Sequence, residues 1–334
     1  MVSRAPMAAV FGCAGPELSQ DEAAFFRDCD PLGFILFARN CQTPEQIRRL
    51  TADLRQAVGR ATAPVLMDHE GGRVQRLSHP PWRQVPAPAA LGALPEEDAV
   101  TAARLNGRLM AMELLDLGVD VNCVPCLDVN DPAGHQVIGD RAFSADPALV
   151  AQLGRAQADG MLAGGLLPVI KHLPGHGRAG VDSHLELPVV TAGRSELSER
   201  DFKPFQAMAD LPLGMTAHVL FPDLDPADPA TLSKTIIEQI IRNQIGFTGL
   251  LFTDDLSMQA LGGEIGQRAA RALAAGCDIA LHCNGKPAEM QAVAAACSAL
   301  SAPGQNRWQR ALAARRLPDP AAYEELCARF QKLF

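Results

Sequence analysis

The sequence predicts an α/β fold, a TIM (β/α)8 barrel in a single domain, and two observations carry this prediction. Eight short, almost continuously apolar runs recur along the 334 residues, as expected for parallel strands that are covered on both faces. Segments with helical periodicity separate successive runs. Eight β/α alternations in a chain of this length are typical of one barrel.

The apolar runs are the predicted strands. They cover residues 8–12, 33–37, 64–70, 119–129, 167–172, 213–219, 249–255 and 277–283. The first run is interpreted as a buried strand and not a signal peptide, because it is short and polar residues follow it directly. A doubly wound sheet is the alternative fold. It usually carries a phosphate-binding glycine loop after its first strand, and "FGCAGPE" lacks that pattern.

Helix ends can be placed from capping residues and glycine. Helix starts are predicted at four N-capping side chains: Ser19, Thr43, Asp146 and Ser233. A long helix near residues 96–117 should end at Gly118, a residue suited to the left-handed conformation that follows a helix. An amphipathic helix over about 319–332 is expected to pack on the barrel, so that residues 1–334 form one domain.

Composition argues against several classes of protein. A net charge of −8 is atypical of nucleic-acid binders, and no apolar run is long enough to cross a membrane. Nine cysteines without regular spacing suit a reducing compartment. The single Cys123-x-x-Cys126 pair lacks the second pair that a structural zinc site needs. We expect a cytoplasmic monomer without a cofactor, binding neither nucleic acid nor membrane.

Ionisable side chains collect where the predicted strands end, which is where TIM barrels carry their active sites. The group comprises Asp68, His69, Glu70, Asp128, Lys171, His172, His218, Asp254, Asp255 and His282. Such residues are rarely buried without a role, so their repeated placement predicts a site. Several carboxylates beside a few cations, with no P-loop, favour a neutral, hydroxyl-rich substrate.

The stretch "KHLPGHGRAGVDSHLELP" (171–188) predicts a long functional loop after the fifth strand. Asp182 lies two residues before His184 and can accept a hydrogen bond from its ring, which suits a proton shuttle. A metal site formed by the histidines and aspartate of this stretch is the alternative. Pro174 and Gly175 interrupt the His172-x3-His176 spacing, so this is not a helical zinc-binding pair.

Five sequence blocks together resemble family 3 of the glycoside hydrolases, specifically its single-domain bacterial β-N-acetylglucosaminidases. The blocks are "DHEGGRVQRL" (68–77), "GDRAFSADP" (139–147), the stretch 171–188, "TAHVLFPDLD" (216–225) and "LLFTDDLSM" (250–258). They follow the order of the family and cover most of the chain. The lysine–histidine block with its Asp-Ser-His, followed by Thr-Asp-Asp-Leu-Ser-Met, is the most specific part.

The resemblance implies a retaining exo-β-N-acetylglucosaminidase of peptidoglycan recycling. Its substrates would be muropeptides with N-acetylglucosamine β-1,4-linked to 1,6-anhydro-N-acetylmuramic acid. By motif, Asp254 would be the nucleophile and His184 the acid/base, with Asp182 as its partner. The residues implied in sugar binding are Asp68, Arg76, Arg141, Lys171 and His172. Strand alternation also favours Asp254 over Asp255, and His176 is taken as support for the loop.

The sequence departs from the family pattern at two positions. His69 stands where glutamine is more common, and Leu173 replaces the usual phenylalanine. Two functions outside this class stay open, a metal-dependent hydrolase and a non-catalytic sugar-binding barrel. Within the class, a phosphorylase is possible, because a neutral histidine repels phosphate less than a carboxylate would.

Overall fold

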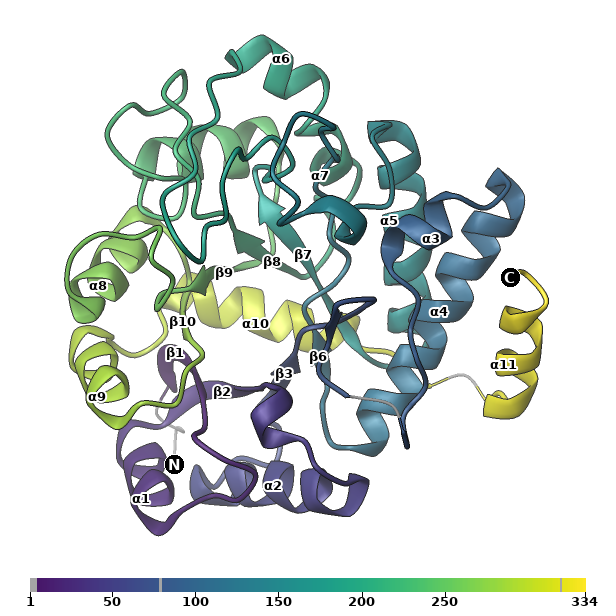
Figure 1. Ribbon diagram of the computed structural model, residues 1–334. Coiled ribbons are helices and arrows are strands. Elements are labelled where there is room, and N and C mark those ends of the chain that lie inside the picture. Colours follow the sequence, from purple (N-terminus) through teal and green to yellow (C-terminus); the bar gives the residue numbers. More distant parts are fainter. Residues whose placement is uncertain (1–4, 78–79, 319) are drawn as a thin grey trace.

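Eight parallel strands close into a barrel in the computed structural model, which describes residues 5–77, 80–318 and 320–334 (Figure 1). Around the barrel the order is β1-β10-β9-β8-β7-β6-β3-β2. The barrel strands are β1 (Met7–Gly12), β2 (Pro31–Leu36), β3 (Val65–Met67), β6 (Val121–Asn122), β7 (Leu167–Leu173), β8 (Leu213–Thr216), β9 (Leu250–Asp255) and β10 (Ile279–His282). Each overlaps one of the eight predicted runs, so the TIM-barrel prediction is confirmed.

Helices surround this barrel (Figure 1). They are α1 (Gln20–Cys29), α2 (Pro44–Ala57), α3 (Pro88–Gly92), α4 (Glu96–Asp116), α5 (Pro147–Ala163), α6 (Arg194–Glu199), α7 (Lys203–Ala207), α8 (Ile265–Ala275), α9 (Pro287–Ala296), α10 (Ala302–Ala314) and α11 (Tyr323–Gln331). Shorter or wider turns are η1 (Ala38–Asn40), η2 (Gly139–Arg141) and η3 (Ile236–Gln244). Within the described ranges, no helix combines the length and the apolar character that crossing a bilayer demands.

The predicted capping residues bind the first turns of their helices. Ser19 forms a complete capping box at α1, and Thr43 accepts the backbone N–H of Gln46 at α2. Asp146 caps α5, and the Ser233 hydroxyl accepts the N–H of Ile236 at 3.0 Å. These bonds satisfy amide groups that have no partner inside the helix, which explains why each helix begins where it does.

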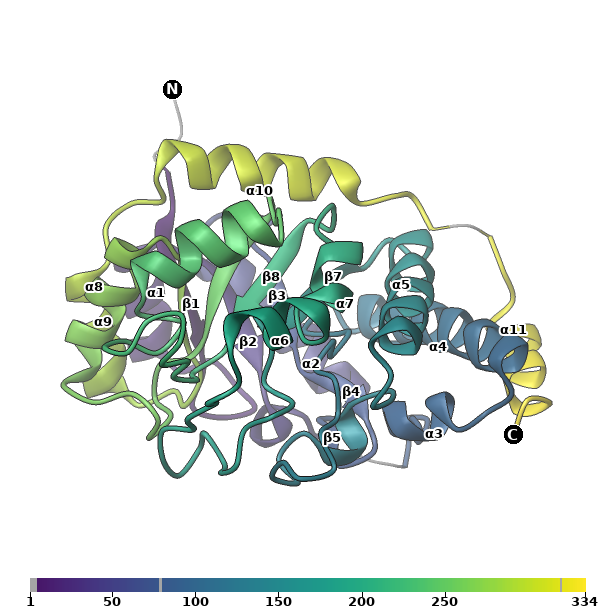
Figure 2. The same cartoon turned by 90° about the horizontal axis from the view of Figure 1, so that it is seen from above.

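The amino end of the barrel is closed by α10, which runs across it (Figure 2). Trp308 and Ala311 of α10 belong to the same apolar cluster as side chains from the barrel strands, such as Val10, Leu66 and Phe252. A second core lies between the strands and the surrounding helices. The filled interior and the plugged amino end leave the carboxyl end of the strands for a cavity.

The third predicted run does not continue as one strand to residue 70. β3 ends at Met67, and residues His69–Gly71 form β4, which pairs antiparallel with β5 (Val74–Gln75). Gly71 and Gly72 have φ of 105° and 55°, a conformation that glycine adopts without the cost a side chain would impose. The chain therefore turns back over the mouth of the barrel directly after Glu70.

Candidate active site

A cavity of about 190 Å³ opens at the carboxyl ends of the strands. Seven of the eight side chains assigned to the site from sequence line it: Asp68, Arg76, Arg141, Lys171, His172, His184 and Asp254. The eighth, Asp182, lies beside it and binds His184. Segments far apart in the chain therefore bring one predicted set of residues together.

Two carboxylates hold a buried lysine and a partly buried arginine in one wall of the cavity. Lys171 Nζ lies 2.7 Å from Asp68 Oδ1 and 2.7 Å from Glu70 Oε1. Arg141 donates to Glu70 through Nε and Nη2, each at 2.8 Å, which is the bidentate geometry of a strong pair. Arg76 Nη2 reaches Asp68 Oδ2 at 3.3 Å. The wall therefore presents fixed hydrogen-bond donors and acceptors to the cavity.

The cations in this wall outweigh the effect of burial on the carboxylates. Burial alone would raise the pKa of Asp68, but Lys171 and Arg76 bring it below its usual value. Burial likewise opposes ionisation of Glu70, and Arg141 with Lys171 holds the pKa of Glu70 well below its usual range. The pKa of Lys171 is raised, because Asp68 and Glu70 overcome the effect of burial. Asp68, Glu70 and Lys171 are therefore charged at neutral pH.

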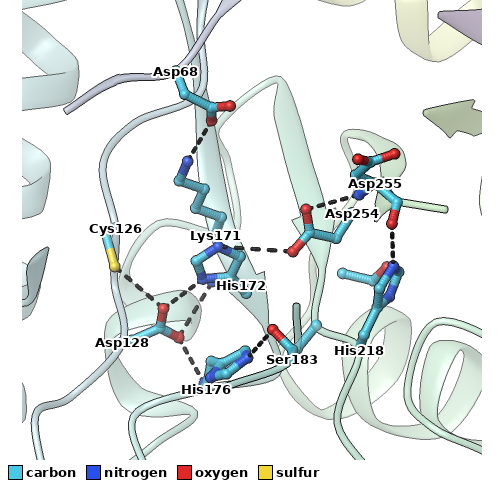
Figure 3. Close-up of polar contacts among 12 residues, drawn as sticks. Asp68, Cys126, Asp128, Lys171, His172, His176, Ser183, His218, Asp254 and Asp255 are labelled. Carbon is cyan, nitrogen blue, oxygen red and sulfur yellow. Dashed lines mark hydrogen bonds and ion pairs between the residues drawn. The ribbon is translucent and has the colours of Figure 1, made fainter. Parts of the chain in front are cut away.

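Asp254 is the next-to-last residue of β9 and faces His172 across the cavity (Figure 3). Asp254 Oδ2 lies 4.0 Å from His172 Nε2, and its Oδ1 accepts the backbone N–H of Asp255 at 2.8 Å. Burial raises the pKa of Asp254. The combined effect of His172, His218 and the Asp255 N–H is larger and brings this pKa below its usual value, so the carboxylate is ionised. The Asp255 carboxylate instead accepts the Ser257 hydroxyl at 2.6 Å and does not line the cavity.

The loop after β7 carries Asp182 and His184 to the mouth of the cavity. His184 Nδ1 lies 2.7 Å from Asp182 Oδ1, which also accepts the His184 backbone N–H at 2.9 Å. Because burial is slight, these bonds outweigh it and lower the pKa of Asp182. The His184 side chain is 63% exposed although it lines the cavity, so it reaches both the site and solvent.

The inner part of this loop is held against the barrel. His176 Nε2 lies 3.1 Å from Ser183 Oγ, and a Cβ added to Gly177 would come within 1.9 Å of the Val129 carbonyl oxygen. Burial, with the neighbouring His172, lowers the pKa of His176 to about 4. A neutral, buried His176 therefore supports the segment that precedes the exposed His184.

Sequence reasoning gave no role to two carboxylates of this region, Glu70 and Asp128. Both were recognised at strand ends, but their partners lie far along the chain. Glu70 binds Arg141, 71 residues away, and Asp128 Oδ2 lies 2.6 Å from Nδ1 of His172, 44 residues away. Position at a strand end is the signal that could have marked them, although it does not identify a partner.

A metal site of His172, His176, Asp182 and His184, the alternative considered from sequence, does not form. Among the residues that the structure describes, one group of three possible ligands lies close enough together to share an ion. It consists of Cys126, Asp128 and His172. Their polar atoms already bind each other, with Cys126 Sγ 3.2 Å and His172 Nδ1 2.6 Å from Asp128 Oδ2. Hydrogen bonding accounts for this grouping.

Comparison with known proteins decides the family. Residues 9–313 match the family described as the glycosyl hydrolase family 3 N terminal domain. The chain belongs to family 3. Over 284 residues it is 43% identical to the Beta-hexosaminidase of Alkalilimnicola ehrlichii, covering 82% of this chain and 80% of that protein. The predicted resemblance is thereby confirmed, and this family 3 member is a glycoside hydrolase of the β-N-acetylhexosaminidase class.

Solved structures resemble this family 3 chain over its whole length. NagZ from Neisseria gonorrhoeae in complex with N-trifluoroacetyl-D-glucosamine is 34% identical with a TM-score of 0.85, covering 100% of this chain and 97% of that one. NagZ from the same organism in complex with zinc ion is 32% identical with a TM-score of 0.84, and the coverage is the same. These likenesses agree with a barrel fold that holds its site at one end.

Proposed function

We propose that this family 3 enzyme is a retaining exo-β-N-acetylglucosaminidase of peptidoglycan recycling. It removes non-reducing terminal N-acetylglucosamine that is β-1,4-linked to 1,6-anhydro-N-acetylmuramic acid in muropeptides. The observation that carries the proposal is that Asp254 and His184 line one cavity together with a wall of paired charges. The glucosamine derivative bound by the gonococcal NagZ supports the choice of sugar.

In this proposal, five side chains hold the terminal sugar: Asp68, Arg76, Arg141, Lys171 and His172. Carboxylates accept from sugar hydroxyls, while the cations donate to hydroxyl oxygens. Since Lys171 is 2% exposed and paired with two carboxylates, it is already fixed before the sugar arrives. Little side-chain freedom is then lost on binding, which favours affinity.

Hydrolysis proceeds in two steps with retention of configuration. The ionised Asp254 attacks the anomeric carbon while His184 gives a proton to the departing glycosidic oxygen. Neutral His184 then takes a proton from a water molecule whose oxygen attacks the anomeric carbon. The bond between that carbon and Asp254 breaks, and the sugar is released. Ionised Asp182 accepts from His184 Nδ1, so Nε2 is the atom that exchanges the proton with substrate.

The test is turnover of 4-nitrophenyl β-N-acetylglucosaminide by wild type, Asp254→Ala and His184→Ala, each with and without EDTA. We expect both variants to be inactive and EDTA to have no effect on wild type. Asp255→Asn is the matched control, because its carboxylate binds Ser257 outside the cavity. Full activity in Asp254→Ala, or an inactive wild type, would refute the proposal.

One gonococcal NagZ structure contains a zinc ion, so the same reactions also test a second candidate, a metal-dependent hydrolase, although the loop residues considered from sequence do not gather around an ion here. EDTA would then abolish turnover and added zinc would restore it.

The same reactions, run with and without inorganic phosphate, identify the molecule that accepts the glycosyl group. We expect free N-acetylglucosamine in both, whereas a sugar 1-phosphate would identify a phosphorylase.

We further propose that residues 1–334 act as one catalytic domain in a cytoplasmic monomer. Light scattering coupled to gel filtration measures the molecular mass in solution, and a monomer should give 35.5 kDa. A mass near twice that value would contradict this part of the proposal without affecting the mechanism.

A further inference from the structure

Asp128 lies behind the wall of the active site and is fully buried. It follows β6, and its carboxylate lies against the segment that joins β7 to the loop (Figure 3). It does not line the cavity that holds Asp254 and His184. Any effect of Asp128 on the reaction must therefore pass through another side chain.

Four donors surround this carboxylate. Oδ2 lies 2.6 Å from His172 Nδ1 and accepts from Cys126 Sγ at 3.2 Å. Oδ1 accepts the backbone N–H of His176 at 2.7 Å and that of His172 at 3.3 Å. Burial alone would raise the pKa of Asp128, but the two histidines hold it well below its usual range. Both oxygens act as acceptors, so the group is a charged carboxylate.

The charge on Asp128 determines which nitrogen of His172 carries hydrogen. An ionised carboxylate only accepts, so Nδ1 of His172 must be the donor in a contact of 2.6 Å. The other nitrogen, Nε2, then faces the reaction, 3.4 Å from Arg141 Nη2 and 4.0 Å from Asp254 Oδ2. The hydrogen bond at one ring nitrogen thus fixes both the orientation of the ring and the state of its far side.

We propose that Asp128 is a positioning residue for glycoside cleavage, which holds His172 with Nδ1 protonated so that Nε2 stays directed at the sugar and at Asp254. The inference rests on the proposed function, since it takes Asp254 as the nucleophile. An amide at position 128 could not replace the carboxylate, because its one oxygen can serve either the backbone amides or the His172 ring. The NH₂ group of the asparagine would then meet either the His172 ring N–H or the backbone N–H groups, which places two donors against each other.

The first experiment records ¹⁵N spectra of histidine-labelled wild type and Asp128→Asn, with His172→Gln used to assign the signals of residue 172. We expect His172 to carry hydrogen on Nδ1 in wild type and to lose that state in Asp128→Asn. A wild-type spectrum with hydrogen on Nε2 alone would overturn the proposal, and this result needs no variant of Asp128 to fold.

The second experiment measures kcat/KM for 4-nitrophenyl β-N-acetylglucosaminide. Asp128→Asn should lower it about 10- to 100-fold, the range found when the hydrogen-bond partner that orients a metal-binding histidine is removed, since the partner has the same orienting task here. Asp120→Asn is the matched control. Asp120 precedes the same strand, is also buried, and accepts the Val65 N–H at 2.8 Å at the opposite end of the barrel. It should retain wild-type kcat/KM.

A double variant separates positioning from a merely structural role. If Asp128 acts through His172, Asp128→Asn/His172→Gln should be no less active than His172→Gln alone, because the two losses share one cause. Losses that multiply, or an Asp128→Asn enzyme with wild-type kcat/KM, would overturn the inference. An inactive wild type would instead refute the proposed function, while the spectra would still report the state of His172.

Discussion

The two ends of the barrel both bury carboxylates beside cations, yet the environments have opposite effects. At the amino end, Asp120 lies 3.4 Å from Arg55 and 3.3 Å from Arg315, and burial still raises its pKa. At the carboxyl end, cations prevail over burial, and the pKa values of Asp68 and Glu70 fall. Pairing alone therefore does not decide whether the pKa of such a carboxylate rises or falls.

The pairs at the two ends also differ in what lies around them. Asp120 and Asp278 accept backbone N–H groups at the start of neighbouring strands, and arginines of the α10 region cover them. These pairs close the barrel. The pairs at the carboxyl end instead border a cavity, so their remaining donors and acceptors can meet a ligand. One end is built for closure and the other for binding.

The largest expected effect comes from Asp254→Asn. It should lower kcat by about 10⁴-fold, because the attacking carboxylate is lost, in the range found for single members of catalytic groups. The free energy of unfolding should change by less than about 1 kcal/mol, since the neutral amide is nearly the same size. Turnover and urea unfolding check the two parts. A large loss of stability would mean that Asp254 also serves the fold.

Asp278→Ala should give the reverse result. Asp278 binds Arg242 at 3.1 Å, Arg307 at 2.7 Å and the N–H of Leu251 at 3.0 Å. Removing it takes the carboxylate away from Arg242 and Arg307, and the free energy of unfolding should fall by about 3–5 kcal/mol, as when one partner of a buried pair is lost. Urea unfolding measures the loss, and kcat/KM should stay within about twofold of wild type. Equal damage to activity would end the division between the two ends.

Acid should weaken the carboxyl end through His176. Its pKa of about 4 in the folded protein lies below the ordinary value near 6.5, so the unfolded chain binds more protons between these values. The free energy of unfolding should therefore fall as pH drops from about 6.5 to about 4, by on the order of 3 kcal/mol.

Urea unfolding at several pH values measures this slope in wild type and in His176→Gln. The variant lacks the titrating ring and should show a shallower slope. Some slope should persist, because burial also lowers the pKa of His69, to about 3. Identical slopes in the two proteins would mean that His176 is not buried in its neutral form.

The smallest effect is expected at the rim of the same end. Arg73 Nε lies 2.9 Å from Asp140 Oδ1, with both side chains nearly half exposed. Asp140→Asn should change the free energy of unfolding by less than about 1 kcal/mol, because water and salt screen exposed pairs. Urea midpoints at low and high salt check this. A loss as large as that of Asp278→Ala would show that position matters more than burial.

The fold could be predicted from sequence because its signals are local. Each strand corresponds to an apolar run in the sequence, and capping side chains such as Ser19 act within one helical turn. The plug α10 was not predicted, since Pro303 and Gly304 near its start weaken the helical pattern. The turn after Glu70 was not predicted either, because Asp68, His69 and Glu70 directly follow the apolar residues 64–67 and were assigned to the same strand.

Residues of the candidate site could be collected from their positions at strand ends, but their pairings could not. Nothing near Glu70 in the chain indicates Arg141, and nothing near Asp128 indicates His172, because closure of the barrel creates both contacts. Type and position in sequence therefore predicted which residues gather. The partner of each residue followed from three-dimensional geometry.

Pairing of β1 with β10, the first and last strands in chain order, completes the ring. A nascent chain cannot complete the enzyme until β10 has left the ribosome, even though the residues of the cavity end at Met258. Until then the edges of β1 and β9 offer unpaired amides to other chains, a known route to aggregation. Translation arrest before residue 279 should thus yield an insoluble, inactive product in which every proposed catalytic group has already been made.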